Sequence, residues 1–276
     1  MATSGGEWAD GSPEGERRLE LLWRVADRPR RGPRPGLSLD AIVAAAVGLA
    51  DAEGLGAVSM QRVAAELGYT TMSLYRYVSS KEQLVELMAD DALGEPPAPE
   101  AADWRARLEE VSRALVAVYR NRPWLLGVEI SGPPEGPNQL SWFEAYLETL
   151  AEAELPGYER VAVVLFIDGA VREIARIAVQ VEGARRAGGV SDDAAGAVYA
   201  SVLRRFAVPE RYPNIAALAA EGVFDPEPPG RGATRGADWG LVDAMGTDIA
   251  FGLHRLLDGV EAYASGRTRP ATRGKA

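Results

Sequence analysis

The chain has 276 residues, of which 47% are hydrophobic and 25% are charged, and its formal net charge is −10. This composition is typical of a globular protein with one large domain or two modest ones. With no cysteine and a single histidine, His254, the sequence excludes a disulfide framework, a cysteine nucleophile and the histidine-rich zinc sites, although a carboxylate magnesium site stays open. No cofactor or metal is expected.

The first 36 residues are predicted to form an extension outside the folded domains. Residues 1–16 are polar and glycine-rich, which is typical of disorder, and residues 17–27 have a short amphipathic helical pattern. Residues 28–36 contain three prolines and two glycines, which exclude a helix, together with four arginines. We interpret this segment as either an extended basic arm or a solvated linker.

Four helices are predicted to follow, most of them with a clear start signal. Ser38, Ser59 and Ser80 are typical N-cap residues and precede predicted helices at 39–53, 60–67 and 81–93. The last of these also opens with the capping box Ser80-x-x-Gln83. A further short helix is expected at 71–77.

The rest of the chain has the periodicity of helices, and no alternating strand pattern of useful length occurs. Helices are predicted at 103–121, 123–129, 138–154, 157–186, 192–206, 209–221 and 238–264, with a loop rich in proline and glycine at 224–236. We therefore expect an all-α fold with a basic tail.

The helices at 60–67 and 71–77 have the spacing of a helix-turn-helix, whose second helix enters the major groove of DNA. Leu74 and Val78 are expected to face the core, which turns hydroxyl groups and Arg76 outward. Residues 67–81 contain no acidic residue, as the approach to phosphates requires. From residue 28 to residue 81, seven basic against four acidic residues give +3, so this basic segment contrasts with an acidic remainder.

At residues 39–87 the chain resembles the DNA-binding domain of TetR-family transcriptional regulators. The resemblance rests on VAAELGYTTMSLYRYVSSKEQL (63–84), with Leu-Gly at the turn, Leu-Tyr-Arg-Tyr-Val in the second helix and Lys81 opening the fourth. The segment IAFGLHRLLDGVE (249–261) is similar to the last helix of the tetracycline-repressor subgroup. In that subgroup this helix and the long helix, here 157–186, form half of a four-helix dimer bundle.

The resemblance implies an N-terminal three-helix helix-turn-helix domain and a larger helical domain for ligand binding and dimerisation. We expect the extension at 1–36, the DNA-binding domain at 37–82, the regulatory domain at 83–265 and a flexible tail at 266–276. Four residues near the end of the regulatory domain are expected at the dimer interface: Phe251, Leu253, His254 and Leu257.

The resemblance also assigns DNA contacts by position. Base contacts match Thr71, Met72, Ser73, Arg76 and Tyr77, phosphate contacts match Tyr75 and Lys81, and Gln61 and Arg62 match second-helix positions near the DNA. The arm arginines, among them Arg30, Arg31 and Arg34, would enter the adjacent minor groove, where arginine is favoured. Taken alone, Tyr75 and Tyr77 are equally compatible with a packing role.

A ligand pocket is expected between helices of the regulatory domain. Its lining is predicted from the aromatic residues and from Asp168, which directly follows seven apolar residues: Trp104, Tyr119, Trp124, Trp142, Phe143, Tyr146, Phe166 and Asp168. The alternative is that these aromatics form only the core. Tetracycline repressors hold a drug–magnesium chelate with histidines, and none precedes His254 here, so that effector does not fit.

We therefore expect a transcriptional repressor, not an enzyme: a homodimer that binds a palindromic double-stranded operator and is released from it by an apolar or amphipathic small molecule. Repression and activation are both compatible with the sequence. Alternatives are a regulator that answers to a protein or to no ligand, and an enzyme using the same cavity, for which no nucleophile elbow or phosphate-binding glycine loop occurs. The longest apolar runs, at 41–50 and 161–167, are shorter than the roughly 20 residues of a membrane span. No signal peptide is seen either, so a cytoplasmic location without membrane contact is expected.

Overall fold

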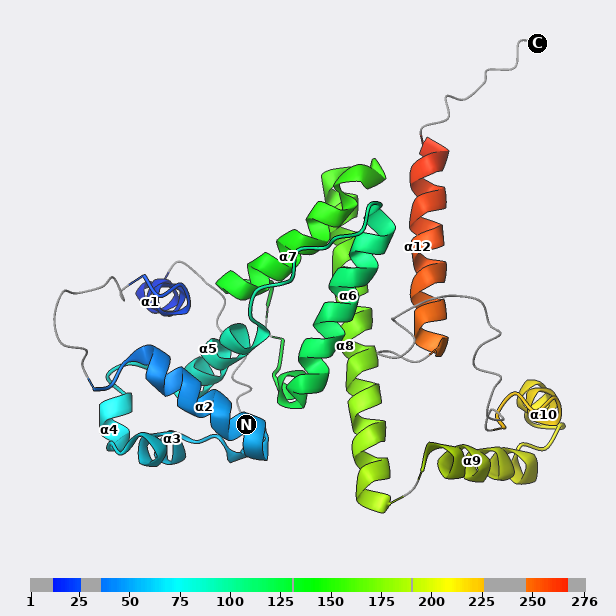
Figure 1. Ribbon diagram of the computed structural model, residues 1–276, viewed down its shortest axis with the longest axis horizontal. Helices are drawn as coiled ribbons and strands as arrows, with labels where there is room; N and C mark the ends of the chain where they lie inside the picture. Colours follow the sequence, from blue (N-terminus) through cyan, green and yellow to red (C-terminus); the bar gives the residue numbers. More distant parts are fainter. Residues whose placement is uncertain (1–11, 26–35, 131, 190, 226–246, 268–276) are drawn as a thin grey trace, which may run out of the picture. The chain divides into compact units, whose positions relative to one another are not determined.

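The computed structural model describes residues 12–25, 36–130, 132–189, 191–225 and 247–267, and every regular element in these ranges is a helix (Figure 1). The chain forms two compact units, one of residues 1–176 with 241–276 and one of residues 177–240. No helix among the described residues is long and apolar enough to cross a membrane.

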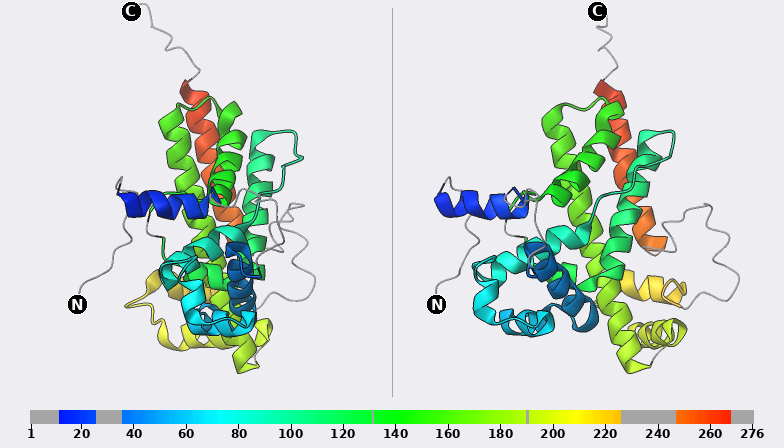
Figure 2. Two further views of the ribbon diagram at one scale, coloured as in Figure 1. Left: turned by 90° about the vertical axis from the view of Figure 1, so that its left-hand side faces the viewer. Right: turned by 60° about the vertical axis from the view of Figure 1, so that its left-hand side comes forward.

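The helix-turn-helix lies in the first unit. It comprises α2 (Leu39–Glu53), the short 3-10 helix η1 (Leu55–Ala57), α3 (Met60–Leu67) and α4 (Thr71–Leu74), with α2 packed against α3 and η1, and α3 against α4 (Figure 2). The predicted serine caps are present, since the side chains of the serines before α2 and α3 accept hydrogen bonds from the backbone three residues later. These local signals explain why the predicted bounds of both helices are confirmed.

The predicted helix at 71–77 was too long, because α4 ends at Leu74. A tight turn follows, in which the backbone N–H of Tyr77 donates to the carbonyl of Leu74 at 2.8 Å and that of Val78 donates to the same carbonyl at 3.1 Å. The turn lets both Leu74 and Val78 become fully buried. Core packing therefore decides the shape of this segment beyond its first turn.

A helix also occupies part of the predicted disordered N-terminus. Helix α1 (Pro13–Leu22) starts four residues before the predicted amphipathic segment, and the Ser12 hydroxyl accepts a hydrogen bond from Gly15 N at 3.1 Å. Ser12 as N-cap, Pro13 at the first helical position and Glu14 in the first turn are all helix-start signals. The prediction gave more weight to the polar, glycine-rich composition than to these helix-start signals, and it was wrong at residues 13–16.

Helix α5 (Lys81–Leu93) connects the helix-turn-helix to the remaining helices of this unit and packs against α1, α2 and α7. Those helices are α6 (Trp104–Asn121), η2 (Pro123–Gly127), α7 (Pro137–Thr149), η3 (Leu150–Ala153), the first part of α8 (Gly157–Gly188) and α12 (Thr247–Arg267). The predicted starts at residues 81 and 157 are confirmed, whereas the predicted helix at 138–154 ends as a 3-10 turn.

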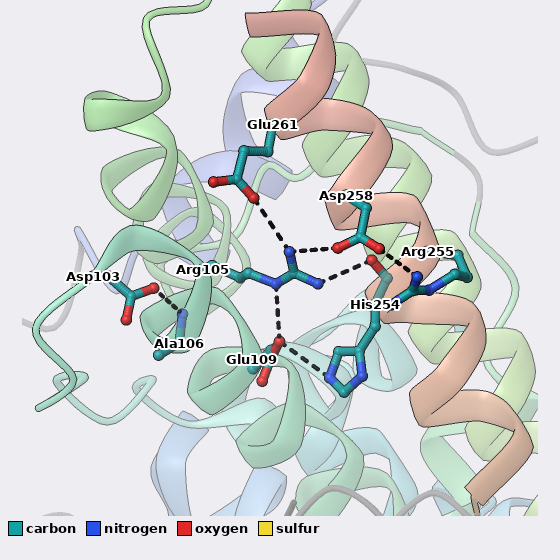
Figure 3. A network of polar contacts seen from close by, with 8 residues as sticks. All are labelled: Asp103, Arg105, Ala106, Glu109, His254, Arg255, Asp258 and Glu261. Carbon is teal, nitrogen blue, oxygen red and sulfur yellow. Dashed lines mark hydrogen bonds and ion pairs between the residues drawn. The ribbon is translucent and has the colours of Figure 1, made fainter. Parts of the chain in front are cut away.

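Helix α12 is fastened to α6 by a polar network (Figure 3). Arg105 of α6 lies 2.6 Å from Asp258 and 3.3 Å from Glu261, and it donates a hydrogen bond to the carbonyl of His254 at 3.1 Å. Glu109, one turn further along α6, is buried and lies 3.2 Å from His254 Nε2. The network fixes which face of α12 turns inward.

The second unit contains the last turns of α8, α9 (Asp192–Phe206) and α10 (Pro213–Ala220). Helices α9 and α10 pack against each other, and Tyr199 meets Phe224 edge to face with ring centroids 6.0 Å apart. The predicted bounds of α9 are confirmed, while α10 starts four residues later than the predicted 209.

Candidate DNA-binding surface and ligand cavity

The helix-turn-helix exposes most of the residues that the sequence assigns to DNA. Met72 is 74% and Tyr75 46% exposed. Four others are exposed as well, namely Gln61, Arg62, Arg76 and Lys81. Thr71 and Ser73 are half-buried, and the Ser73 hydroxyl lies 3.0 Å from that of Thr70.

Two of the assigned side chains are already engaged within the protein. The Arg62 guanidinium forms a two-pronged ion pair with Glu53 at 2.8 and 2.5 Å, so DNA would have to compete for it. The Tyr77 hydroxyl donates to the carbonyl of Leu37 at 2.9 Å. This bond connects the start of the domain to the end of the reading segment, residues 71–78. The hydroxyl group of Tyr77 therefore has a structural role, as the alternative interpretation of this residue expected.

Sequence reasoning missed Tyr69 and Thr70, which are exposed in the turn before α4. The Tyr69 ring end lies close to Gly36, where a Cβ atom would be 2.5 Å from the tyrosine hydroxyl oxygen and the exposed ring would have to shift. The available signal was that both residues belong to the acid-free segment 67–81. The arm arginines Arg30, Arg31 and Arg34 lie outside the described residues.

A cavity of about 1500 Å³ lies in the first unit. Its outer part is lined by α1, by the N-terminal half of α5 and by the segment before it, and its inner part by α6, η2, α7 and α8. Five of the eight predicted pocket residues come together in the inner part: Tyr119, Trp142, Phe143, Tyr146 and Asp168. The sequence missed Arg172, one turn after Asp168, because a charge in a long helix is usually solvated.

The other three predicted pocket residues do not line this cavity. Phe166 is 63% exposed, because two helical positions separate it from Asp168 and turn it to the opposite side of α8. Trp124 is buried, and its indole Nε1 donates to the carboxylate of Asp51 in α2 at 2.6 Å. Trp104 begins α6 and is half-buried away from the lining.

The polar groups of the inner wall form hydrogen bonds within the protein, and burial changes the pKa of two of them. Arg172 Nη2 donates to the carbonyls of Leu125 and Val128 at 3.1 and 2.6 Å. The Tyr146 hydroxyl donates to Ser112 Oγ at 3.3 Å. Burial raises the pKa of Tyr146 and of Asp168, and the Arg172 charge opposes that rise at Asp168. The tyrosine hydroxyl is therefore a hydrogen-bond donor at every physiological pH.

The cavity wall is attached directly to the helix that follows the helix-turn-helix. Asp90 of α5 is buried and accepts hydrogen bonds from the backbone of Asn138 and Gln139 at 3.3 and 3.0 Å, so it caps α7 from another helix. Glycine is required at position 136, where a Cβ would lie 2.1 Å from the Asp90 carboxylate. Trp142, which lines the cavity, donates to the carbonyl of Gly94 at 2.9 Å.

The expected dimer-interface residues point into the protomer. Leu253, His254 and Leu257 are buried within the single chain, because the network with α6 turns this side of α12 inward. Their burial leaves little of these three side chains for a partner to contact, and the side chain of Phe251 lies outside the described part of the chain. The exposed apolar residues of this region lie elsewhere, on α8 and α12: Tyr158, Val161, Leu165, Phe166 and Tyr263.

Comparison with known proteins gives a consistent result. Residues 42–88 match the model of "Bacterial regulatory proteins, tetR family", and residues 96–224 match "Tetracyclin repressor-like, C-terminal domain". The chain is 39% identical over 269 residues to the HTH-type transcriptional repressor DrrR1 of Streptomyces coeruleorubidus. This match covers 96% of this chain and 92% of that protein.

Solved structures share the fold. Apo ActR from Streptomyces coelicolor aligns with a TM-score of 0.64 at 24% identity, covering 86% of this chain and all of that chain. ActR in complex with actinorhodin aligns at 0.61 and 26% identity, covering 84% of this chain and 99% of that one. Together with the helix-turn-helix and the second helical region, these matches identify the chain as a member of the TetR family of transcriptional regulators.

Proposed function

We propose that the chain is a dimeric repressor that binds a palindromic operator and leaves it when a small molecule occupies the cavity. The observation that carries the proposal is the exposed, acid-free surface of the helix-turn-helix. Arg76 is suited to base edges in the major groove, and Lys81 and the Tyr75 hydroxyl are suited to phosphates. Thr71, Met72 and Ser73 would complete the reading surface.

The effector would act through α5. This helix begins at the DNA-proximal Lys81 and ends among the hydrogen bonds from Asn138, Gln139 and Trp142. A ligand that moved α7 would carry α5 with it and change the position of the reading segment. The ligand can shift DNA affinity only by its preference for one of the two arrangements, typically about 1–3 kcal/mol.

Dimerisation is proposed to use the exposed side of α8 and α12. Gly252, Gly259 and Gly266 recur every seven residues on α12, and nothing lies within 4 Å of a Cβ built at any of them. A partner helix could therefore approach this side closely. Leu165 and Phe166 of α8 would add apolar area, and the two reading segments would then address half-sites about 34–36 Å apart.

The relatives support the direction of regulation and the kind of effector. The relative with 39% identity is named a transcriptional repressor, and ActR has been crystallised with actinorhodin and with (S)-DNPA. We accordingly propose repression, with release by an organic small molecule, as the function of this chain. A cytoplasmic site of action follows from DNA binding.

The test is selection of random duplex DNA by the purified protein at fixed salt. We expect an enriched near-palindrome, and Arg76→Ala should weaken its binding by about 1–3 kcal/mol if this side chain reads a base. Arg186→Ala is the matched control, since it removes the same charge from an exposed, ion-paired position of α8 outside the helix-turn-helix. Selection without an enriched sequence, or equal binding by both variants, would contradict the proposal.

A further inference from the structure

The carboxylate of Asp168 is unmatched in the cavity wall. It contributes to the lining of the inner part, and among the described residues it has no hydrogen-bond or ion-pair partner. Asp168 is half-buried, so a molecule in the cavity can reach its carboxylate. Partial burial without a hydrogen-bonded partner makes the charged form of this group costly. The same cavity lining contains four aromatic residues, namely Tyr119, Trp142, Phe143 and Tyr146.

Arg172, one helical turn after Asp168, already interacts with other groups of the protein. Arg172 donates to the carbonyls of Leu125 and Val128, and its guanidinium lies over the Tyr119 ring, 5.7 Å from the centroid. It lowers the pKa of Asp168 through space, but burial raises that pKa by more. Asp168 in turn raises the pKa of both Tyr119 and Tyr146, which places its charge near the two phenols.

The rest of the cavity lining also favours a positively charged ligand. Its lining includes seven carboxylate residues against five lysines and arginines, so the cavity as a whole favours positive charge. Aromatic faces attract cations as well, as the position of Arg172 over Tyr119 illustrates. The volume of about 1500 Å³, including the outer part, exceeds what a drug-sized molecule needs.

Building on the proposed ligand-responsive function, we propose that the effector is an amphipathic cation, with a protonated amine that pairs with Asp168 and an aromatic body that contacts the aromatic part of the lining. The amine would keep the Asp168 carboxylate charged and supply the hydrogen-bond donor that the free protein lacks there. A neutral analogue of the same shape would leave this carboxylate without a partner.

Two compounds that differ in one group test the inference: biphenyl-4-ylmethanamine, which is protonated at neutral pH, and biphenyl-4-ylmethanol, which is neutral. Binding to the full chain is followed by calorimetry and by quenching of tryptophan emission, to which Trp142 contributes. We expect the amine to bind about tenfold more tightly than the alcohol, a typical value for one buried charge pair. Asp168→Asn should abolish that preference and leave the affinity for the alcohol unchanged.

Glu173→Gln is the matched control. It removes a carboxylate from the same helix, at an exposed position paired with Arg176, and should retain the preference for the amine. Equal binding of both compounds by the native chain, binding of neither, or an amine preference that survives Asp168→Asn would overturn the inference. Because the assay contains no DNA, these results are independent of operator binding, whose absence would contradict the proposed function alone.

Discussion

At the residue scale, the two tyrosines that follow Leu74 have different surroundings. Tyr75 is exposed and its hydroxyl has no hydrogen-bond partner among the described residues, whereas the Tyr77 hydroxyl donates to the carbonyl of the buried Leu37. The pattern Leu-Tyr-Arg-Tyr-Val presents both tyrosines in the same way. What separates them is the chain 40 residues earlier, which passes within reach of only one.

This difference makes a prediction for a matched pair of variants. Tyr77→Phe leaves the Leu37 carbonyl unpaired and should lower the free energy of unfolding by about 1 kcal/mol. Tyr75→Phe should leave stability unchanged and weaken operator binding several-fold, because it removes a hydroxyl suited to a phosphate. Chemical denaturation and binding titrations measure the two effects. Weaker operator binding by Tyr77→Phe at unchanged stability would reassign its hydroxyl to DNA.

At the element scale, Arg18 of α1 and Arg24 just after it connect this segment to the rest of its unit, and Arg24 pairs with Asp40 and Asp91. Arg18 pairs with Glu86 of α5 and with Glu135 of the loop before α7, and the Trp23 indole donates to the carbonyl of Glu135 at 3.0 Å. Burial is the main cause that raises the pKa of Glu86, and the Arg18 charge opposes it. Helix α1 thus bridges α5 and the loop before α7, and both of these contribute residues to the cavity lining.

Removing the Arg18 cation should loosen α1. Arg18→Ala leaves two partly buried carboxylates without their partner, and we expect a loss of about 1–2 kcal/mol in unfolding free energy after allowing for solvent screening. Arg17→Ala, an exposed charge on the same helix, is the control and should have little effect. Thermal unfolding reports stability, and limited proteolysis reports detachment of residues 12–25. Equal behaviour of the two variants would show that apolar packing, with Leu22 buried, holds α1 by itself.

At the scale of the whole molecule, the proposed dimer would couple assembly and DNA reading by symmetry. A palindromic operator requires two reading segments at a fixed separation, so a monomer should bind each half-site only weakly. The exposed apolar side of α8 and α12 is the surface that two copies could share. The buried side, with Leu257 fully inaccessible, belongs to the protomer core.

Charged residues on the exposed side should therefore separate the dimer. We expect the double variant Leu165→Glu with Phe166→Glu to sediment as a folded monomer and to lose cooperative operator binding. Leu140→Glu, at a partly exposed leucine of α7, is the control and should remain dimeric. A dimer that survives the double variant would place the interface elsewhere. Leu257→Glu should instead unfold the chain, because it buries a charge in the core.

The sequence alone determined the helices and the reading surface. Helices α2, α3, α5 and α9 begin after serines whose side chains cap them, and such signals act within three residues. The exposure of Arg76 and Lys81 follows from the same local pattern, since Leu74 and Val78 commit the opposite side to the core. The start of α1 was placed four residues too late, because composition was weighed above its cap.

The tertiary structure decided which aromatic residues face the cavity and which side of α12 faces inward. Trp124 and Phe166 lie in predicted helices, as Trp142 and Phe143 do, but the hydrogen bond to Asp51 and the direction of Phe166 on α8 take them out of the lining. His254 and Leu257 are buried because Arg105 and Glu109, some 150 residues earlier in the chain, bind that side of α12. Such contacts depend on how helices cross, and periodicity along one helix carries no information about its partner.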